Sequence, residues 1–259
     1  MHLTVASSLG LDDVDRRIVA PPDRGGESLE LGGLAHDLAA ASLVMARRFA
    51  AGATMWCVSP AWPAHGRHVA VEFVHPVIVG KRALPSVFVD TDDVVADLRV
   101  LVRPGDVVLA VAAAGEPGVA AAMRRGPAWG ATTVWVGAGA RPDVAAADHV
   151  LWVDDGTGLA PWSGRFVLLY HLLWELTHVC FEHPGLLRDG AADACAEEAC
   201  ITCSDEGRLA EVCASPSAGE ARVRTATGVE TADVSLVEPV SPGDLVLLHA
   251  GSAITRVPG

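Results

Sequence analysis

The chain has 259 residues, of which 51% are hydrophobic and 20% charged, so it is long enough for two domains and apolar enough for a sizeable core. Lys and Arg number 19 against 32 Asp and Glu, a formal net charge of -13. This acidic balance offers no electrostatic footprint for nucleic acid or anionic membranes, so we expect neither as a partner. The longest apolar stretch, residues 166–181, is interrupted by His171, Glu175 and His178 and is too short to span a bilayer.

The N-terminus and the cysteine count indicate the compartment. The first residues, MHLTVASSLGLDD, lack a basic start followed by an apolar run, so we expect no secretory signal. Six cysteines in a chain of this length do not make a disulfide scaffold. In a reducing compartment they serve as thiols, metal ligands or catalytic groups. We therefore expect a cytoplasmic protein.

Helices alternate with strands through the first two thirds of the chain. After an arm at residues 1–30, helical spacing and breakers predict helices over 31–51, 64–74, 92–100, 118–129 and 163–182, the third capped by Thr91 or Asp92. Short apolar runs predict strands over 54–59, 86–90, 106–111, 132–137 and 149–153. Within 106–111, the residues after Asp106 are continuously apolar, as in a strand covered on both faces. The alternation predicts a doubly wound parallel sheet in flavodoxin-like α/β layers.

The pattern changes after residue 183. Residues 184–198 are polar and Ala-rich and are expected to form a linker. From residue 199 to 259, short apolar runs separated by Gly, Pro and Ser predict a small all-β barrel of the OB type. We thus expect an α/β domain over 31–183 and a barrel domain over 199–259. A core so small is marginal, so the barrel is expected to dock on the first domain or on a partner.

The sharpest motif lies in the barrel region. CITCSDEGRLAEV (200–212) is followed by GDLVLLHAGSAITRV (243–257), and together they resemble the HypC/HupF family of hydrogenase formation chaperones, in particular actinobacterial HupF. The resemblance implies that Cys200 and His249 contact iron, with Cys203 as the alternative thiolate. It also implies two partners, a HypD-type maturation protein and a hydrogenase large-subunit precursor.

The chemistry of this pair suits a carrier. Thiolate and imidazole are both suitable ligands for the iron of an Fe(CN)2CO fragment, and two protein ligands leave positions open for transfer. The chain departs from the family because the cysteine is internal and the C-terminal helix is missing. Other readings of the same residues stay open. Cys200 and Cys203 with Cys195 and Cys213 could form a zinc site or a redox dithiol, and His249 could be a core histidine.

Two helices carry stripes of imidazoles and carboxylates. The first stripe has His65, His68, Glu72 and His75, and the second has His171, Glu175, His178 and Glu182. The spacing places each set along one helix face. Burying such groups unpaired is costly, so we expect the stripes to meet each other, water or a metal.

The same segments resemble the SIS fold and, within it, the phosphoheptose isomerases. HGRHVAVEF (65–73) and YHLLWELTH (170–178) are similar to segments of that family. The resemblance implies that His68, Glu72 and His171 are three of four zinc ligands, and that Glu72 and His171 are also the base and acid that move a proton between C1 and C2 of a sugar. The fourth ligand position falls on Ser163, and His65 is a geometric substitute.

The phosphate-binding segments of that family are not matched. Its hydroxyl-rich loop corresponds to Ala112, Ala113, Ala114 and Gly115 followed by Glu116, which supply no hydroxyl and add a repelling carboxylate. We therefore expect no phosphoheptose isomerase activity. The first hypothesis is a non-enzymatic [NiFe] hydrogenase maturation factor, with zinc as a further cofactor of the α/β domain. The alternatives are a sugar-phosphate isomerase or binding protein with a regulatory barrel, and a metal or redox sensor. The apolar helix at 163–182 favours a homo-oligomer.

Overall fold

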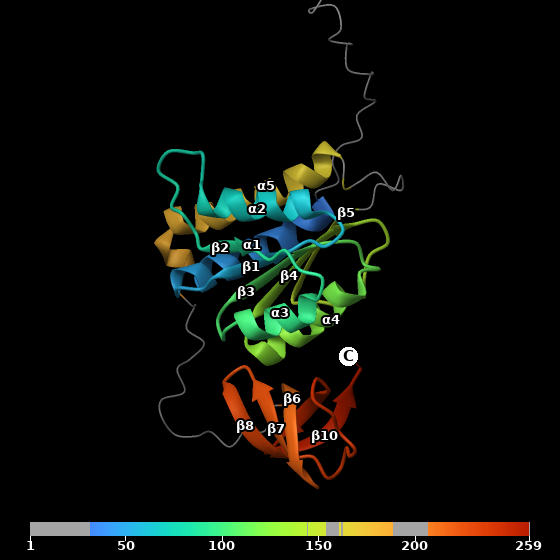
Figure 1. The fold of residues 1–259 in the computed structure, drawn as a ribbon. Coiled ribbons are helices and arrows are strands. Elements are labelled where there is room, and N and C mark those ends of the chain that lie inside the picture. The colour runs from blue at the N-terminus through green and yellow to red at the C-terminus, as the bar shows by residue number, and fades with distance from the viewer. Residues whose placement is uncertain (1–31, 144, 154–160, 162, 189–206, 259) are drawn as a thin grey trace, which may run out of the picture.

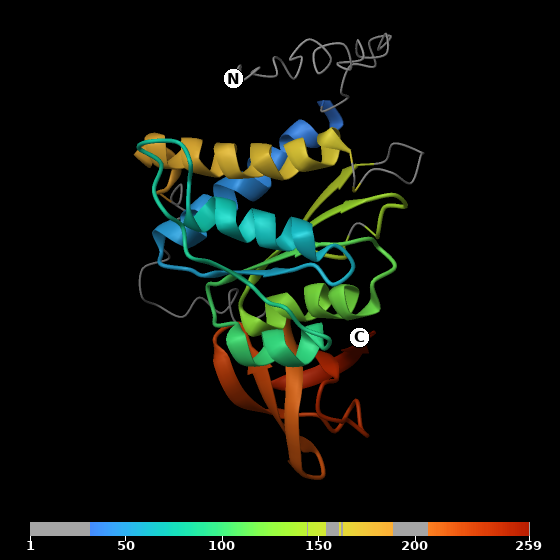
Figure 2. The same cartoon turned by 45° about the horizontal axis from the view of Figure 1, so that its top comes forward.

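A computed structural model describes residues 32–143, 145–153, 161, 163–188 and 207–258. An α/β layer structure comes first and a β-barrel follows it, on the side of helices α3 and α4 (Figures 1 and 2). The expected arm at 1–30 lies outside the described residues. The domain limits stay a prediction, because residues 189–206 lie outside them as well. Within the described part of the chain, no helix combines the length and hydropathy needed to cross a bilayer.

The sheet of the first part has five parallel strands in the order β2-β1-β3-β4-β5. The strands are β1 (Met55–Val58), β2 (Ser86–Phe88), β3 (Val107–Val111), β4 (Thr132–Ala138) and β5 (His149–Val153). Strand β1 pairs with β2 on one side and with the central β3 on the other, so that Cys57 lies opposite Phe88 and Leu109. This arrangement confirms the expected doubly wound parallel sheet.

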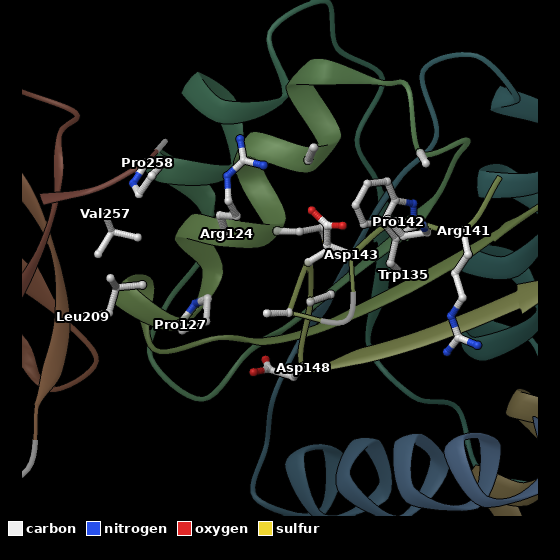
Figure 3. A pocket seen from close by; sticks show the side chains of 16 residues that line it. Arg124, Pro127, Trp135, Arg141, Pro142, Asp143, Asp148, Leu209, Val257 and Pro258 are labelled. Atoms are coloured by element: carbon white, nitrogen blue, oxygen red, sulfur yellow. The ribbon is translucent and has the colours of Figure 1, made fainter.

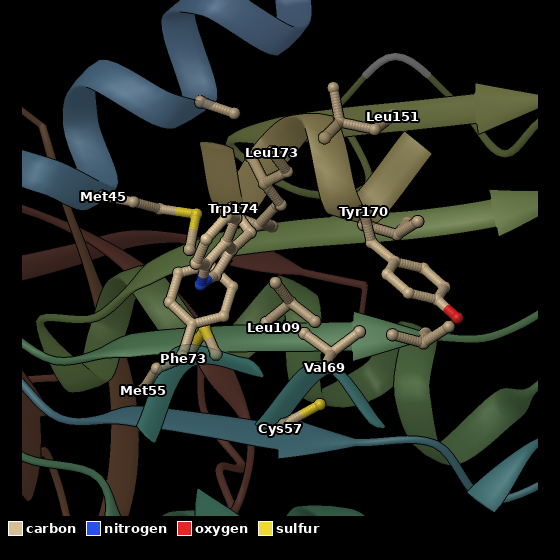
Figure 4. Packing of buried hydrophobic residues seen from close by; sticks show 14 of the residues in the cluster. Met45, Met55, Cys57, Val69, Phe73, Leu109, Leu151, Tyr170, Leu173 and Trp174 are labelled. Carbon is tan, nitrogen blue, oxygen red and sulfur yellow. The ribbon is translucent and has the colours of Figure 1, made fainter. Parts of the chain in front are cut away.

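Helices cover both faces of this sheet. One face carries α1 (Gly32–Ala50), α2 (Pro63–Val74) and α5 (Gly164–Glu182), and the other carries α3 (Val94–Leu101), α4 (Pro117–Arg125) and the 3-10 helix η3 (Gly126–Trp129). Successive residues of β3 alternate between the two cores, with Leu109 in the first and Val108 in the second. All of β3 is buried, as its continuous apolar run predicts. Figure 4 shows the first core, where Phe73, Leu109 and Trp174 pack together.

Two helix ends differ from expectation. The helix expected to begin at Thr91 or Asp92 is capped by Asp93 instead, whose Oδ1 accepts the N–H of Ala96 at 3.0 Å. Thr91 supports the turn, because its hydroxyl accepts the N–H of Asp93. The helix expected over 118–129 ends at Arg125 and continues as η3. Pro127 has no N–H for an α-helical hydrogen bond, so the last turn tightens.

The second part is a closed five-stranded barrel in the order β10-β8-β7-β6-β9. Its strands are β6 (Arg208–Ser217), β7 (Glu220–Thr225), β8 (Gly228–Asp233), β9 (Leu245–His249) and β10 (Ser252–Val257). Small side chains fill its core, including Ala210, Ala221 and Ala232. The short apolar runs therefore form a barrel as expected, with β10 supplied by the end of the GDLVLLHAGSAITRV segment.

The barrel docks on the α/β part through polar contacts of β7 and of the loop before β9. Arg224 of β7 donates to the carbonyl oxygens of Arg99 and Val102 at 2.6 and 2.7 Å, at the end of α3. Arg125 of α4 donates to the carbonyl of Gly243 at 3.2 Å. A small core that docks on a larger neighbour is the arrangement expected from its size.

Candidate metal site between α2 and α5

Helices α2 and α5 lie side by side on one face of the sheet (Figure 2). Pro63 begins α2, where its missing N–H costs nothing. Ser163 caps α5 by accepting the N–H of Phe166 at 3.2 Å. The indole of Trp174 ties the helices together, since its Nε1 donates to the backbone oxygen of Glu72 at 2.8 Å. The polar residues of both helices therefore have fixed positions relative to one another.

Three of the expected ligands converge. His68, Glu72 and His171 each offer one ligand atom, and these atoms all lie within 4.8 Å of one another. Nε2 of His68 is 3.3 Å from Oε1 of Glu72, and Nε2 of His171 is 3.9 Å from the same oxygen. His68 is exposed and the other two are partly exposed, so solutes can reach the cluster.

Each imidazole of the cluster is oriented through its other nitrogen. Nδ1 of His171 lies 2.8 Å from the carbonyl of Val167 and donates to it, so Nε2 is the ring nitrogen that faces Glu72. Nδ1 of His68 lies 3.3 Å from the hydroxyl of Tyr170. Metal-binding histidines are usually held in this way by a hydrogen bond on the far ring nitrogen.

Tyr170 connects the cluster to a deeper histidine. Its hydroxyl lies 3.2 Å from Nδ1 of His65 as well as near His68. Burial, and to a smaller extent the charge of Glu72, together raise the pKa of Tyr170 to about 12, so the phenol stays neutral. Burial lowers the pKa of His65, which favours its neutral imidazole. His65 thus lies behind Tyr170 and is not among the three residues whose ligand atoms converge.

The second stripe does not act as one unit. Glu175 and Glu182 both accept hydrogen bonds from Lys81, at 3.1 and 2.7 Å. His178 is buried between the carbonyl oxygens of Trp174 and Arg82, at 2.9 and 3.0 Å. Among the four residues of this stripe, only His171 faces Glu72. Helix α2 ends at Val74, and the loop after it places Lys81 and Arg82 beside the other three residues. His75 lies just beyond the end of α2.

The loops that follow β1 and β3 hold no outward hydroxyl. Ala112 to Gly115 follow β3, and Glu116 directly precedes α4 but its side chain does not cap the helix. The hydroxyl of Ser59 lies 2.7 Å from the carbonyls of both Trp62 and Val111, so it is used internally. The Trp62 ring packs edge-on against Phe166, with centroids 5.6 Å apart.

The expected iron ligands are only partly described. Cys200, Cys203 and Cys195 lie outside the described residues. His249 ends β9 and pairs with Ser252 of β10. Ala250 and Gly251 between them have φ of 48° and 85°, so the chain reverses at the histidine. Cys213 is exposed on β6.

Comparisons with known proteins extend only to the fold. No protein-family model and no curated protein matches the chain. Among solved structures, a phosphoheptose isomerase from Francisella tularensis is 12% identical with a TM-score of 0.48, and one from Neisseria gonorrhoeae is 17% identical with a TM-score of 0.45. Each alignment covers 56% of this chain and 86% of the other. Values this low carry no conclusion about activity.

Sequence reasoning missed three residues that organise these contacts. The hydroxyl of Tyr170 lies between two histidines. Tyr170 is the chain's single tyrosine and directly precedes His171, which is the one sequence feature that could have drawn attention to it. Lys81 lies in a loop whose sequence shows no regular pattern, and it donates hydrogen bonds to two carboxylates. Glu211 is buried where the barrel meets the α/β part, and nothing in the local sequence distinguishes it from a surface residue.

Proposed function

We propose that the α/β part is an isomerase-like domain that binds a divalent transition metal, Zn²⁺ above all, through His68, Glu72 and His171. The supporting observation is the convergence of three ligand atoms within 4.8 Å of one another. Two imidazoles and one carboxylate are a usual donor set for zinc, and three protein ligands leave a position open for water or substrate. Bound there, the metal would act as a Lewis acid towards an oxygen ligand.

The protein residues set what that open position can accept. Glu72 supplies a carboxylate that is mostly shielded from solvent, and His171 supplies an imidazole whose tautomer the Val167 carbonyl fixes. A hydroxy-carbonyl compound could reach them, because His68 at the edge is exposed. The alanine loop and Glu116 disfavour a phosphate group beside α4. We therefore propose metal binding without sugar-phosphate turnover.

Zinc titration of the metal-free protein tests this proposal. Isothermal calorimetry should show one site per chain, and Glu72→Gln should weaken it at least about tenfold because a ligand charge is lost. His75→Ala is the matched control, since His75 lies beyond the end of α2. The titration is done in a Cys200→Ser, Cys203→Ser background, so that the cysteine motif contributes nothing. Equal zinc affinity of Glu72→Gln and its parent would contradict the site.

We propose as a second function that the barrel is a HypC/HupF-like carrier of an Fe(CN)2CO fragment, working with a HypD-type partner and a hydrogenase large-subunit precursor. The observation that favours it is the fold of the signature segment. Residues 243–257 form β9, a reversal at Ala250 and Gly251, and β10 of a closed barrel, with His249 at the end of β9. In this proposal the thiolate comes from Cys200, or from Cys203.

Infrared spectroscopy tests the carrier proposal. Protein purified without oxygen from a host that expresses the maturation proteins should show CN and CO stretching bands. Cys200→Ala and His249→Ala should remove them, whereas the exposed Cys213→Ala should not. Absence of these bands from the unsubstituted protein, copurified with the HypD-type partner, would rule the proposal out. Zinc in the isolated cysteine motif would instead favour a sensor.

A further inference from the structure

A pocket of about 780 Å³ lies where the barrel meets the α/β part. Leu209, Val257 and Pro258 of the barrel line one side, and residues of α4, η3 and the β4–β5 connection line the other (Figure 3). We propose that this junction pocket binds an organic monoanion with an apolar body, and that Arg124 pairs with its charged group. The proposal is independent of the metal site, which lies on the opposite face of the sheet.

The fold explains why space remains at this place. Parallel strands are usually joined by a helix that covers the sheet, but residues 139–143 and 145–148 between β4 and β5 form no helix. Trp135 of β4 therefore lines the pocket, with Trp152 of β5 packed edge-on beside it at 5.9 Å between centroids. The barrel approaches from the side of η3 and borders the pocket without filling it.

Arg124 is the cation of the pocket that lacks a partner. Its Nε is buried and has no hydrogen-bond partner among the described residues, and no ion pair to it occurs there. The neighbouring Arg125 is already held by Glu211, 3.4 Å away. Arg141 lies 3.5 Å from Asp37 and donates to the carbonyl of Val150. A buried guanidinium nitrogen without a hydrogen-bond partner is unfavourable, so an anion that reaches Nε of Arg124 from the pocket would be stabilised there.

The other lining residues define the class of ligand. Most of the wall is apolar and comes from Ala114, Ala120, Met123, Pro127, Trp135 and Leu209. Asp143 and Asp148 also line the pocket, so a second negative charge on the ligand would be repelled. The volume falls within the range of small-molecule sites, about 300–1,000 Å³, and such sites favour domain junctions. One carboxylate on an apolar body fits these features.

Calorimetry with octanoate tests the pocket. We expect one saturable site per chain, with weaker binding of 1-octanol, which lacks the charge, and of octyl phosphate, which carries a second one. Arg124→Gln should lower octanoate affinity roughly 10- to 100-fold, because a charge-assisted hydrogen bond is lost. Arg222→Gln is the matched control, since Arg222 is exposed on β7 and does not line the pocket.

A second variant separates binding from folding. Ala145 is exposed and lines the pocket, so Ala145→Trp should leave the circular dichroism spectrum unchanged while its indole occupies the space. Loss of octanoate binding in this variant would support the pocket even if Arg124→Gln were unstable. The proposal is overturned by equal octanoate affinity in Arg124→Gln and its parent, by no saturable binding to the parent, or by tighter binding of octyl phosphate.

Discussion

Arg99 of α3 binds the carboxylate of Glu211 in β6 with two nitrogens, its Nη2 and Nε lying 2.6 and 3.1 Å from Oε1. The indole of Trp129 donates to the other oxygen at 2.8 Å. The Glu211 side chain is only 2% exposed, and these partners belong to the α/β part. The carboxylate of Glu211 therefore has its hydrogen-bond and ion-pair partners only when the barrel is docked on the α/β part.

Replacing this carboxylate should destabilise the whole chain. Glu211→Ala would leave Arg99 and Arg125 without their shared anion, and breaking a buried ion pair typically costs about 3–5 kcal/mol. Because Arg99 is partly exposed, we expect a loss in the free energy of unfolding of about 3 kcal/mol. Urea denaturation followed by tryptophan fluorescence measures it.

Glu220→Ala on the neighbouring β7 is the control for that measurement. Glu220 is exposed and its hydrogen bond to Ser217 is local, so its replacement should change the free energy of unfolding by no more than about 0.5 kcal/mol. If Glu211→Ala were as mild as Glu220→Ala, the docking of the barrel would not depend on the buried carboxylate.

Tyr170→Phe should weaken zinc binding without touching a ligand. The change removes the hydroxyl that lies beside Nδ1 of His68, so the imidazole is held less firmly towards Glu72. Loss of such a supporting contact typically costs about 10- to 100-fold in metal affinity. Calorimetric titration with zinc measures the effect.

Thr177→Val provides a matched loss of a buried hydroxyl on the same helix. The hydroxyl of Thr177 donates to the carbonyl of Leu173 and not to His68 or His171. It should lower stability slightly and leave zinc affinity unchanged. Similar zinc affinities for Tyr170→Phe and Thr177→Val would show that the tyrosine does not orient the site.

The ion pairs of Lys81 should stabilise the protein over a defined pH window. The hydrogen bond from Lys81 lowers the pKa of Glu182 below its ordinary 4.5, so this stabilisation is present above pH 4.5 and is lost as pH falls through the lowered value. The same bond raises the pKa of Lys81 above 10.5, so the contribution persists up to pH 10.5 and is lost at higher pH.

Lys81→Met tests this window. The variant should be less stable than its parent between about pH 5 and 10, and the difference should shrink towards pH 3 as the carboxylate of Glu182 takes up a proton. Urea denaturation at several pH values measures it. A difference that stayed constant from pH 3 to 7 would assign the effect to packing of the lysine stem.

Heptose and pentose phosphates should neither bind nor be converted. The loop from Ala112 to Gly115 offers no hydroxyl, and Glu116 at the start of α4 repels a dianion. We expect no change in melting temperature with these compounds, with or without zinc, and no isomer in the product analysis. Turnover that disappears in Glu72→Gln would contradict this and favour an isomerase with a regulatory barrel.

The local pattern of the sequence determined most of the architecture. The apolar run at 107–111 is short, rich in Val and preceded by a Pro-Gly turn, which favours a strand covered on both faces, and alternation of helices and strands permits few other layers. The spacing of His68 and Glu72 is a property of one helix turn, so their proximity follows from the sequence alone. That the barrel region consists of short strands also follows from its turns and short apolar runs.

Only the tertiary structure decided which distant groups meet. The helical stripe of α5 predicted four polar residues on one face, yet only His171 joins Glu72, because Lys81 and the Arg82 carbonyl from the loop after α2 take the others. The buried pair of Arg99 and Glu211 and the pocket beside Arg124 depend on how the barrel docks. The spacing of apolar and polar residues indicates which face of one helix or strand is buried. These contacts depend instead on packing between elements that are far apart in the chain.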